Sequence, residues 1–287
     1  MEEIALQQKA EILIESLQYI KKFHRKIVVI KYGGHAMVDE EAKKTIIQDI
    51  ALLKYVGMFP VIVHGGGPAI NELLLLKGIQ SEFYQGLRIT DQASMEVVEM
   101  ALTGQIAPQI TADLNAFDVK AVSISGKDAQ MMQADYLDEK LGLVGNITHI
   151  QPDYLLNLLA DDYVPVVSPI AFGPNGQSLN INSDEAAWQI AKALNASKLI
   201  LVTDVDGVMA DQHEPSTLIP QVDVARIDEL IEAGIIRGGM IPKLLACTQA
   251  VQGGVERCHI INGTIQHALI FELFTEQGIG TMVKQSL

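Results

Sequence analysis

Residues 26–34 read KIVVIKYGG, and residues 59–67 read FPVIVHGGG. Each segment contains a short run of apolar, mostly β-branched residues and ends in consecutive glycines. Runs of this kind, bounded by charge and glycine, are typical of strands buried on both faces of a parallel sheet. A helical pattern follows each one, over about 39–55 and again from Pro68, where a proline suits the first helical turn. The repeated unit of strand, glycine turn and helix predicts a doubly wound α/β fold.

The remaining sequence continues this alternation of short apolar runs and amphipathic stretches. Further strands are expected at 121–125, 163–170, 198–204 and 256–262, and Asn175-Gly176 signals a hairpin turn. Further helices are expected at about 91–104, 108–117, 152–160, 184–194, 223–233, 240–252 and 265–274. No stretch rich in Pro, Gly or Ser separates two domains. We therefore expect a three-layer αβα sandwich around one continuous, open, mainly parallel sheet, with an N-lobe over 26–195 and a C-lobe over 196–287.

Residues 1–25 form a separate segment in front of the first strand and predict a single helix. Acidic residues begin this segment and basic residues end it, an order that complements the helix dipole. Apolar residues recur in it as a narrow seam, at Leu6, Ala10, Leu13, Leu17 and Ile20. The seam suits a helix packed on its own domain and equally a helix packed on a copy from another subunit.

Composition excludes several classes of protein. The chain has 287 residues, 48% of them hydrophobic, and a formal net charge of −14, which argues against a nucleic-acid partner. No apolar run reaches about 18 residues, and the acidic N-terminus is unlike a signal or transit peptide, so we expect a cytoplasmic protein without a membrane partner. Two cysteines without a C-x-x-C motif do not indicate a disulfide framework. Cys258 beside His259 is better interpreted as a buried pair than as a metal site, because further zinc ligands are missing.

The two glycine turns are the first candidates for a functional site. The sequence has no G-x-x-x-x-G-K-[ST], no G-x-G-x-x-G after a strand, no G-x-S-x-G and no H-E-x-x-H. Glycine turns at the ends of parallel strands allow backbone N–H groups to approach an anion, although they also serve as tight connections alone. Two such turns at one sheet edge, one of them preceded by Lys31, favour an anion site.

Several charged residues accompany these turns, each with two interpretations. Lys31 ends an apolar strand, so its ammonium must reach solvent or an anion. Lys243 begins a helix, where a phosphate or exposure to solvent would offset the unfavourable dipole. Asp184 is expected to cap a helix, a role compatible with holding two lysines. Arg88 either binds a carboxylate or forms a surface ion pair, and His64 is interpreted as structural.

Eight segments in order and spacing resemble the amino-acid kinase family over nearly the whole chain. They are VVIKYGGHAM (28–37), VIVHGGGPAI (61–70), GLRITD (86–91), MEVVEM (95–100), LNINSDEAA (179–187), LILVTDVDGV (199–208), GGMIPK (238–243) and HALIFELFTEQGIGTM (267–282). HGGGP with GLRITD distinguishes the chain from relatives that act on aspartate, carbamate or uridylate. The resemblance is to members that use ATP to convert N-acetyl-L-glutamate to N-acetyl-L-glutamyl 5-phosphate, the second step of arginine biosynthesis.

The resemblance implies a role for each candidate residue. Lys31 and Lys243 would stabilise the transferring phosphoryl group, and Asp184 would orient both lysines. The N-lobe would dimerise and bind the acetylated amino acid, with Arg88 on its α-carboxylate; the binding residues would be Gly66, Gly67, Arg88 and Asn180. The C-lobe would bind ATP, and the residues implied for the nucleotide are Gly33, Gly34, Thr203, Asp204, Val205, Gly207 and Val208. Mg²⁺ would be carried on the ATP phosphates, without a metal site in the protein.

Two features resemble the arginine-sensitive members of the family. One is the helix over residues 1–25, which in those members interlaces dimers into a homohexamer, a trimer of dimers. The other is the signature from His267 to Thr281. The implied L-arginine site comprises Tyr19, His267, Glu272 and Gly278, with Glu272 facing the guanidinium. In some lineages such a ring also binds a nitrogen-signalling trimer of the PII type, which nothing in this sequence decides.

The chain also departs from the family's usual residues. His35 replaces Asn, Leu179 replaces a frequent Tyr, and Gly104–Gln105–Ile106–Ala107–Pro108 replaces G-K-V-N-K.

Two rival functions are also compatible with the sequence. One is a kinase for another carboxylate such as N-acetyl-aminoadipate, since one methylene changes pocket binding by only about 1–3 kcal/mol. The other is a catalytically silent amino-acid sensor on the same fold, which ATP turnover would exclude.

Overall fold

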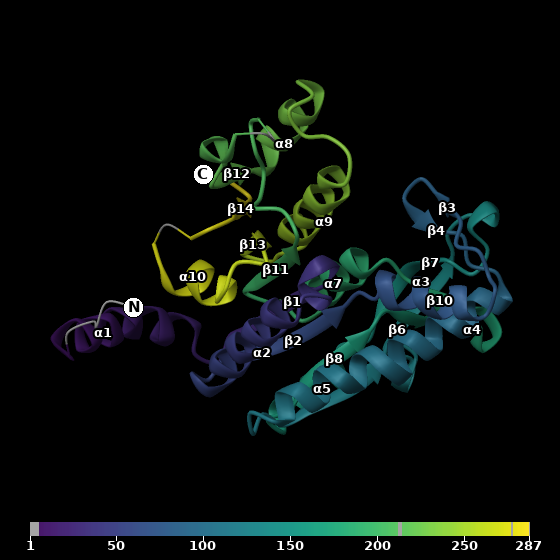
Figure 1. Cartoon of the computed structure of the whole chain (residues 1–287), viewed down its shortest axis with the longest axis horizontal. Coiled ribbons are helices and arrows are strands. Elements are labelled where there is room, and N and C mark those ends of the chain that lie inside the picture. The colour runs from purple at the N-terminus through teal and green to yellow at the C-terminus, as the bar shows by residue number, and fades with distance from the viewer. Residues whose placement is uncertain (1–5, 212–213, 277, 287) are drawn as a thin grey trace.

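The computed structural model describes residues 6–211, 214–276 and 278–286. Within them, eight strands form one open sheet in the order β12-β14-β13-β11-β1-β2-β8-β5 (Figure 1). Their bounds are β1 (Ile27–Tyr32), β2 (Phe59–His64), β5 (Ala121–Ser125), β8 (Val164–Ser168), β11 (Lys198–Thr203), β12 (Gln221–Asp223), β13 (Arg257–Asn262) and β14 (Thr281–Lys284). The pairs are parallel except β13 with β14, which confirms the predicted mainly parallel sheet.

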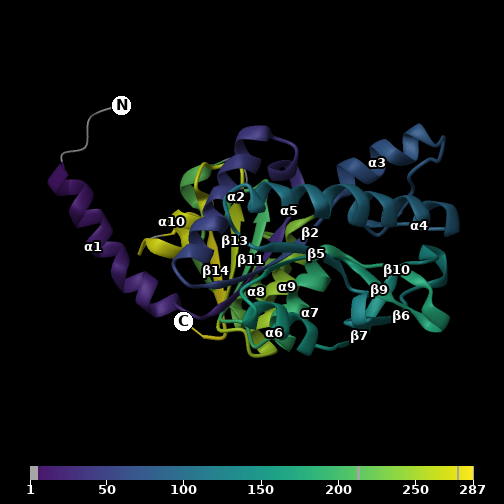
Figure 2. The same ribbon diagram turned by 90° about the horizontal axis from the view of Figure 1, so that it is seen from below.

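Helices cover both faces of the sheet and make the three predicted layers (Figure 2). Within β1, Val28 and Ile30 join the core on one face and Val29 joins the core on the other, as the two-residue period of a strand requires. The first core is closed by α2 (Glu40–Tyr55), α3 (Gly67–Leu76), α4 (Gln92–Glu99), α5 (Ala107–Asn115) and α10 (Ala268–Phe274). The second is closed by α6 (Asp153–Ala160), α7 (Ser183–Ala193), α8 (Val224–Glu232) and α9 (Met240–Gln252).

A second, smaller sheet accompanies the continuous central sheet and was not expected from the sequence. Its order is β10-β9-β6-β7, and a short hairpin, β3-β4, stands apart from both sheets. The bounds are β3 (Phe83–Tyr84), β4 (Leu87–Arg88), β6 (Met132–Tyr136), β7 (Gly145–Ile150), β9 (Ile170–Phe172) and β10 (Ser178–Asn180). The predicted hairpin turn at Asn175-Gly176 joins β9 to β10, with Asn175 at a φ of 56°. In Figure 1 these strands lie at the opposite end of the molecule from α1.

The helical region from Gln92 to Asn115 also differs from the expectation of two separate helices. A π-helix over Met100–Ile106 directly joins α4 to α5. π-helical segments are rare in proteins, and those that occur often lie at functional sites. Gly104 therefore lies inside a continuous helical run, where the sequence suggested a break.

Helix α1 (Leu6–Phe23) extends away from the body of the molecule (Figures 1 and 2). Its C-terminal end is anchored, because Phe23 is buried and Tyr19 makes an edge-on contact with Phe274 of α10, with 6.5 Å between ring centroids. Leu13 and Leu17 of the predicted seam are 71% and 46% exposed. The seam is therefore not covered by the helix's own domain at these positions. No helix of the described residues has the length and apolar character needed to cross a membrane.

Candidate active site

The two glycine turns and the start of α7 converge at the carboxyl ends of β1 and β2. Tyr32 and His64 are aligned in the register of these strands. A Cβ atom on Gly33 would lie 3.8 Å from the Cα of Gly65, and one on Gly65 would lie 3.5 Å from Ser183 Oγ. The two glycine turns therefore lie close together, although the N–H of Gly65 already donates to the carbonyl of Tyr32 at 2.8 Å.

Asp184 lies between two lysines that come from opposite ends of the chain. Its carboxylate is 3.0 Å from Lys31 Nζ of β1 and 3.2 Å from Lys243 Nζ of α9. Only 14% of the Asp184 side chain is exposed. Burial alone would raise the pKa of Asp184, but the two ammonium groups outweigh it and hold the pKa below its usual value. The result is a buried carboxylate that keeps two cations close together.

The expected capping role of Asp184 is wrong. The N-cap of α7 is Asn182, whose side chain accepts hydrogen bonds from the backbone N–H of Asp184 at 2.8 Å and of Glu185 at 3.3 Å. An amide performs this role as well as a carboxylate does. The Asp184 carboxylate is therefore turned toward the lysines. It also offsets the unfavourable position of Lys243 in the first turn of α9.

Because Gly33 has no side chain, the Lys31 side chain has room beside it. A Cβ atom at this position would lie 2.8 Å from Lys31 Nζ, which is closer than real contacts allow. Lysine is flexible, but Asp184 holds this ammonium. A side chain at position 33 would therefore displace this ammonium from its present position beside Asp184.

Arg88 and Asn180 are brought together by Thr90. Thr90 Oγ1 donates to the carbonyl of Arg88 at 2.9 Å and accepts from Asn180 Nδ2 at 3.2 Å. The Arg88 guanidinium is buried, donates to Ser81 Oγ and to Asn71 Oδ1, and lies 4.8 Å from the Phe83 ring centroid. A cation aligned by neutral acceptors retains its charge for an anionic ligand. The sequence missed Asn71 and Ser81, which lie on a helix and a loop without a motif of their own.

Gly66 and Gly67 begin α3, opposite the π-helix. A Cβ on Gly66 would lie 2.5 Å from Leu102 and 2.6 Å from Ile106, two π-helical side chains. The departures from the family pattern at Gln105 and Ile106 therefore fall in this helix, and Leu179 is buried in β10. The side chain of His35 lies outside the described part of the structure.

A cavity of about 490 Å³ opens beside this group, a volume within the range of small-molecule sites. Lys243 lines it, so the cavity adjoins the Asp184 ion pairs. Five of the residues expected at the nucleotide line it: Thr203, Asp204, Val205, Gly207 and Val208. Gly33 and Gly34 lie outside its lining, next to Lys31. Arg237 and Asn262 also line the cavity and were not anticipated, although Asn262 stands at the end of a parallel strand as the other candidates do.

The residues expected at a regulatory site are only partly brought together. Tyr19, Glu272 and Gly278 line a cavity of about 130 Å³ between α1 and the C-terminal region. His267 lies apart from this lining, because its Nδ1 is 2.7 Å from the buried carboxylate of Asp49 in α2. We refer to this cavity as the α1 cavity.

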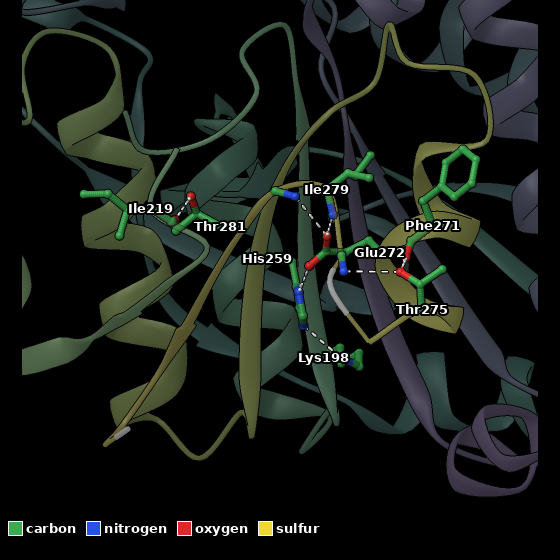
Figure 3. A network of polar contacts seen from close by, with 10 residues as sticks. Lys198, Ile219, His259, Phe271, Glu272, Thr275, Ile279 and Thr281 are labelled. Atoms are coloured by element: carbon green, nitrogen blue, oxygen red, sulfur yellow. Dashed lines mark hydrogen bonds and ion pairs between the residues drawn. The ribbon is translucent and has the colours of Figure 1, made fainter. Parts of the chain in front are cut away.

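Glu272 is held by a buried network at the α1 cavity (Figure 3). His259 contacts Glu272 through Nδ1 and Lys198 Nζ through Nε2, at 2.8 Å for the second contact. An ammonium can only donate, so Nε2 accepts and Nδ1–H donates to the carboxylate. Burial and Lys198 lower the pKa of His259 to about 4, and burial lowers the pKa of Lys198 to about 8. His259 is thus engaged on both ring nitrogens, as expected for a buried strand histidine.

His64 is completely buried beside the glycine turns. Its Nδ1 lies 2.9 Å from the carbonyl oxygen of Gly65, and its Nε2 lies 2.9 Å from Ser168 Oγ. A carbonyl can only accept, so Nδ1 carries the proton. Burial lowers the pKa of His64 to about 4, so the ring is neutral at pH 7. This geometry agrees with the structural interpretation of the residue.

Comparisons with known proteins agree with the fold. The model of the amino acid kinase family matches residues 26–262. An acetylglutamate kinase from Alkaliphilus metalliredigens is 52% identical over 96% of this chain and 87% of its own length. One from Moorella thermoacetica is 47% identical over 96% of this chain and 97% of its own. The structure of N-acetylglutamate synthase from Neisseria gonorrhoeae, 24% identical, shares the fold with a TM-score of 0.85 over 97% of this chain and 64% of that longer one. The chain therefore belongs to the amino acid kinase family.

Proposed function

We propose that this protein transfers the γ-phosphoryl group of ATP to the γ-carboxylate of N-acetyl-L-glutamate. The observation that carries the proposal is the Asp184 carboxylate between Lys31 and Lys243, at 3.0 and 3.2 Å, beside a cavity large enough for a nucleotide. The names of relatives up to 52% identical over nearly the whole chain supply the substrate. We assign the ATP site to residues 196–287 and the acetylglutamate site to residues 26–195.

The chemistry requires positioning and positive charge and does not require a general base. A side-chain carboxylate has a pKa of about 4.3 and is already ionised at pH 7. Catalysis of phosphoryl transfer is mainly electrostatic stabilisation and alignment. Lys31 and Lys243 supply cations, and the glycine turns supply N–H groups. Mg²⁺ bound to the ATP phosphates would neutralise further charge; the oxygen atoms of Asp204 and Asp206 in the cavity lining are donors of the kind that Mg²⁺ prefers.

Arg88 and Asn180 are the proposed contacts of the acetylated amino acid. The guanidinium of Arg88 suits the α-carboxylate. The amide of Asn180, which Thr90 links to the backbone carbonyl of Arg88, suits the acetamido group. Both residues lie in the small strands at one end of the molecule, away from the α1 cavity. Gly66 and Gly67 complete the proposed binding residues.

Acyl-phosphate formation tests the proposal directly. The protein is incubated with Mg-ATP and one acid, and the product is trapped with hydroxylamine. The acids are N-acetyl-L-glutamate, glutamate, aspartate and N-acetyl-aminoadipate. We expect strong signal with N-acetyl-L-glutamate alone. Signal with a different acid would retain the phosphate site and overturn the Arg88 and Asn180 assignment, and no signal with any acid would favour a sensor.

We also propose that L-arginine inhibits the enzyme and that the protein is a hexamer built as a trimer of dimers. The α1 cavity supports the first proposal, because Tyr19 and Gly278 reach it together with the anionic Glu272. Exposed Leu13 and Leu17 support the second, because an apolar seam without cover on its own domain requires another surface. Cooperative loss of activity with L-arginine, and a hexameric mass by sedimentation, are the expected results. Activity that L-arginine leaves unchanged would contradict the first proposal, and a dimeric mass would contradict the second.

A further inference from the structure

Thr281 joins two parts of the molecule that are far apart in sequence. It is the first residue of β14, which lies between β12 and β13 in the sheet, and it is completely buried. Its hydroxyl donates to the carbonyl oxygen of Ile219 at 2.7 Å and accepts from the backbone N–H of Val208 at 2.8 Å. Figure 3 shows the contact with Ile219. Both hydrogen-bonding functions of the hydroxyl are therefore used on other segments of the chain.

One of these segments is the nucleotide loop, defined here as residues 203–208. The whole loop lines the cavity of about 490 Å³. Val208 is fixed from two sides, because its N–H donates to Thr281 and its carbonyl accepts from the N–H of Ile219 at 2.8 Å. Gly207 has a φ of 144°, and a Cβ there would lie 2.6 Å from Thr281 Oγ1. The loop backbone thus rests directly on the Thr281 side chain.

The residues immediately before Thr281 are held by the buried carboxylate of Glu272. Glu272 Oε2 accepts from the N–H of Ile279 at 2.8 Å and of Gly280 at 3.1 Å, and its other oxygen faces His259. These contacts set the position of the two residues immediately before Thr281 (Figure 3). A displacement of the 279–280 backbone would move the hydroxyl on which the nucleotide loop rests.

We infer that Thr281 is a positioning residue for the nucleotide: its hydroxyl sets the conformation of the loop that lines the ATP cavity. The inference rests on the proposed function, since it assumes that the cavity holds ATP. Thr281 would act through Val208 and would not touch the nucleotide itself. Loss of the hydroxyl leaves the Val208 N–H buried without its acceptor, and the loop must then move to find another.

The test compares three variants of the full-length protein. Thr281→Val keeps the shape of the side chain and removes the hydroxyl, whereas Thr281→Ser keeps the hydroxyl. Thr45→Val is the matched control: Thr45 is buried in α2, its Oγ1 donates to the carbonyl of Ala42 at 3.0 Å, and it does not line the cavity. Thr281→Ala removes the same hydroxyl and replaces Thr281→Val if that variant does not fold.

We expect Thr281→Val to raise the KM for ATP about tenfold, because the variant loses both hydrogen bonds of the hydroxyl and the loop depends on the one from Val208. The KM for N-acetyl-L-glutamate and the kcat at saturating ATP should stay within about twofold, and Thr281→Ser should restore the KM for ATP. Thr45→Val should lower the melting temperature without changing the KM for ATP. A merely structural role for Thr281 predicts that both valine variants behave alike, and that result would overturn the inference.

Calorimetric binding of a non-hydrolysable ATP analogue with Mg²⁺ separates this inference from the proposed function. If the wild-type protein forms no acyl phosphate, the proposed function fails, but weaker analogue binding by Thr281→Val than by Thr45→Val still supports the role of Thr281. Equal analogue binding by the two variants would reject that role, whether or not the acid is phosphorylated.

Discussion

At the scale of single residues, the site depends on how Asp184 arranges positive charge. Three side chains that are at most 20% exposed keep one carboxylate and two ammonium groups within ion-pair distance. Each lysine alone would be costly to bury, and the pair would repel each other. The carboxylate makes the arrangement stable, and the net positive charge that remains is available to a phosphoryl group.

Replacing either lysine should slow the reaction far more than it weakens binding. Lys31→Arg or Lys243→Ala is expected to lower kcat by about 10²–10³-fold with a smaller change in KM, because in the proposed mechanism both ammonium groups stabilise the transferring phosphoryl group in the transition state. Steady-state kinetics with N-acetyl-L-glutamate measures both constants. Lys54→Ala is the matched control, since Lys54 pairs with Asp162 at 2.5 Å outside the site. Normal turnover in either site variant would contradict the assignment.

Gly33→Ala should have a similar effect without removing any charged group. The added methyl would lie 2.8 Å from Lys31 Nζ and would force the ammonium away from Asp184. We expect kcat to fall at least tenfold while the melting temperature changes little. Gly104→Ala serves as the control, because a Cβ there meets nothing within 4 Å. Equal kinetics for the two alanine variants would show that Lys31 tolerates the displacement.

At the scale of elements, α1 has apolar side chains that the rest of its own chain does not cover. Its last turn is tied down by Phe23 and by the contact of Tyr19 with Phe274. Leu13, Ile14 and Leu17 are exposed, Leu13 and Ile14 by 70% or more. The helix is therefore anchored at one end and carries exposed apolar side chains on its free part.

Charges on the free part of α1 should break the proposed hexamer without unfolding the subunit. The double variant Leu13→Glu with Leu17→Glu is expected to sediment as a dimer, because both carboxylates would have to be buried in the ring. The melting temperature of the subunit should stay nearly unchanged, since neither side chain belongs to its core. Gln18→Glu adds a charge to an exposed position next to the seam and should remain hexameric. A double variant that sediments like the wild type would argue against α1 as the contact.

Elements with a strong local signal could be predicted from the sequence. The apolar runs of β1 and β2 and the caps at Asp39 and Asp91 identify their strands and helices closely. β14 could not be predicted, because a strand of four residues owes its existence to pairing with β12 and β13. The π-helix was also missed, since its local sequence is helical and the close packing of its Leu102 and Ile106 against Gly66 is a contact between segments far apart in the chain.

The candidate site likewise contains residues that the sequence identifies and contacts that the sequence does not reveal. The sequence motifs single out Lys31, Asp184 and Lys243, and the fold brings them together. The acceptors of Arg88, by contrast, depend on how a loop and α3 meet, which no spacing rule describes. The same holds for Asn182, which takes the capping role expected of Asp184 because either residue type can cap a helix.

At the scale of the whole molecule, stability should depend on pH through a neutral histidine in the core. His64 has a pKa near 4 when folded and about 6.5 when unfolded. Between these values the unfolded chain binds more protons, so the free energy of unfolding falls as the pH is lowered. The contribution is about 3 kcal/mol, fully present above pH 6.5 and lost by pH 4.

Denaturant unfolding between pH 4.5 and pH 7 measures this dependence. We expect His64→Gln to be less stable than the wild type at pH 7 and to lose less stability on acidification. His149→Gln is the control, because His149 is exposed on β7 and its ring contacts only Gln151 at 3.4 Å among the contacts described for it. Parallel pH curves for the wild type and His64→Gln would show that another group sets the acid sensitivity.

The position of β14 between β12 and β13 has a consequence for biosynthesis. A ribosome releases the chain in sequence order, so residues 221–223 and 257–262 emerge before residues 281–284. Until β14 arrives, β13 has an open edge that another nascent chain can pair with. Val208 also lacks its buried acceptor during that interval. The contact between Thr281 and the lining of the cavity of about 490 Å³ therefore forms only after residue 281 has left the exit tunnel, and a chain that ends before that residue is expected to leave the β13 edge open to aggregation.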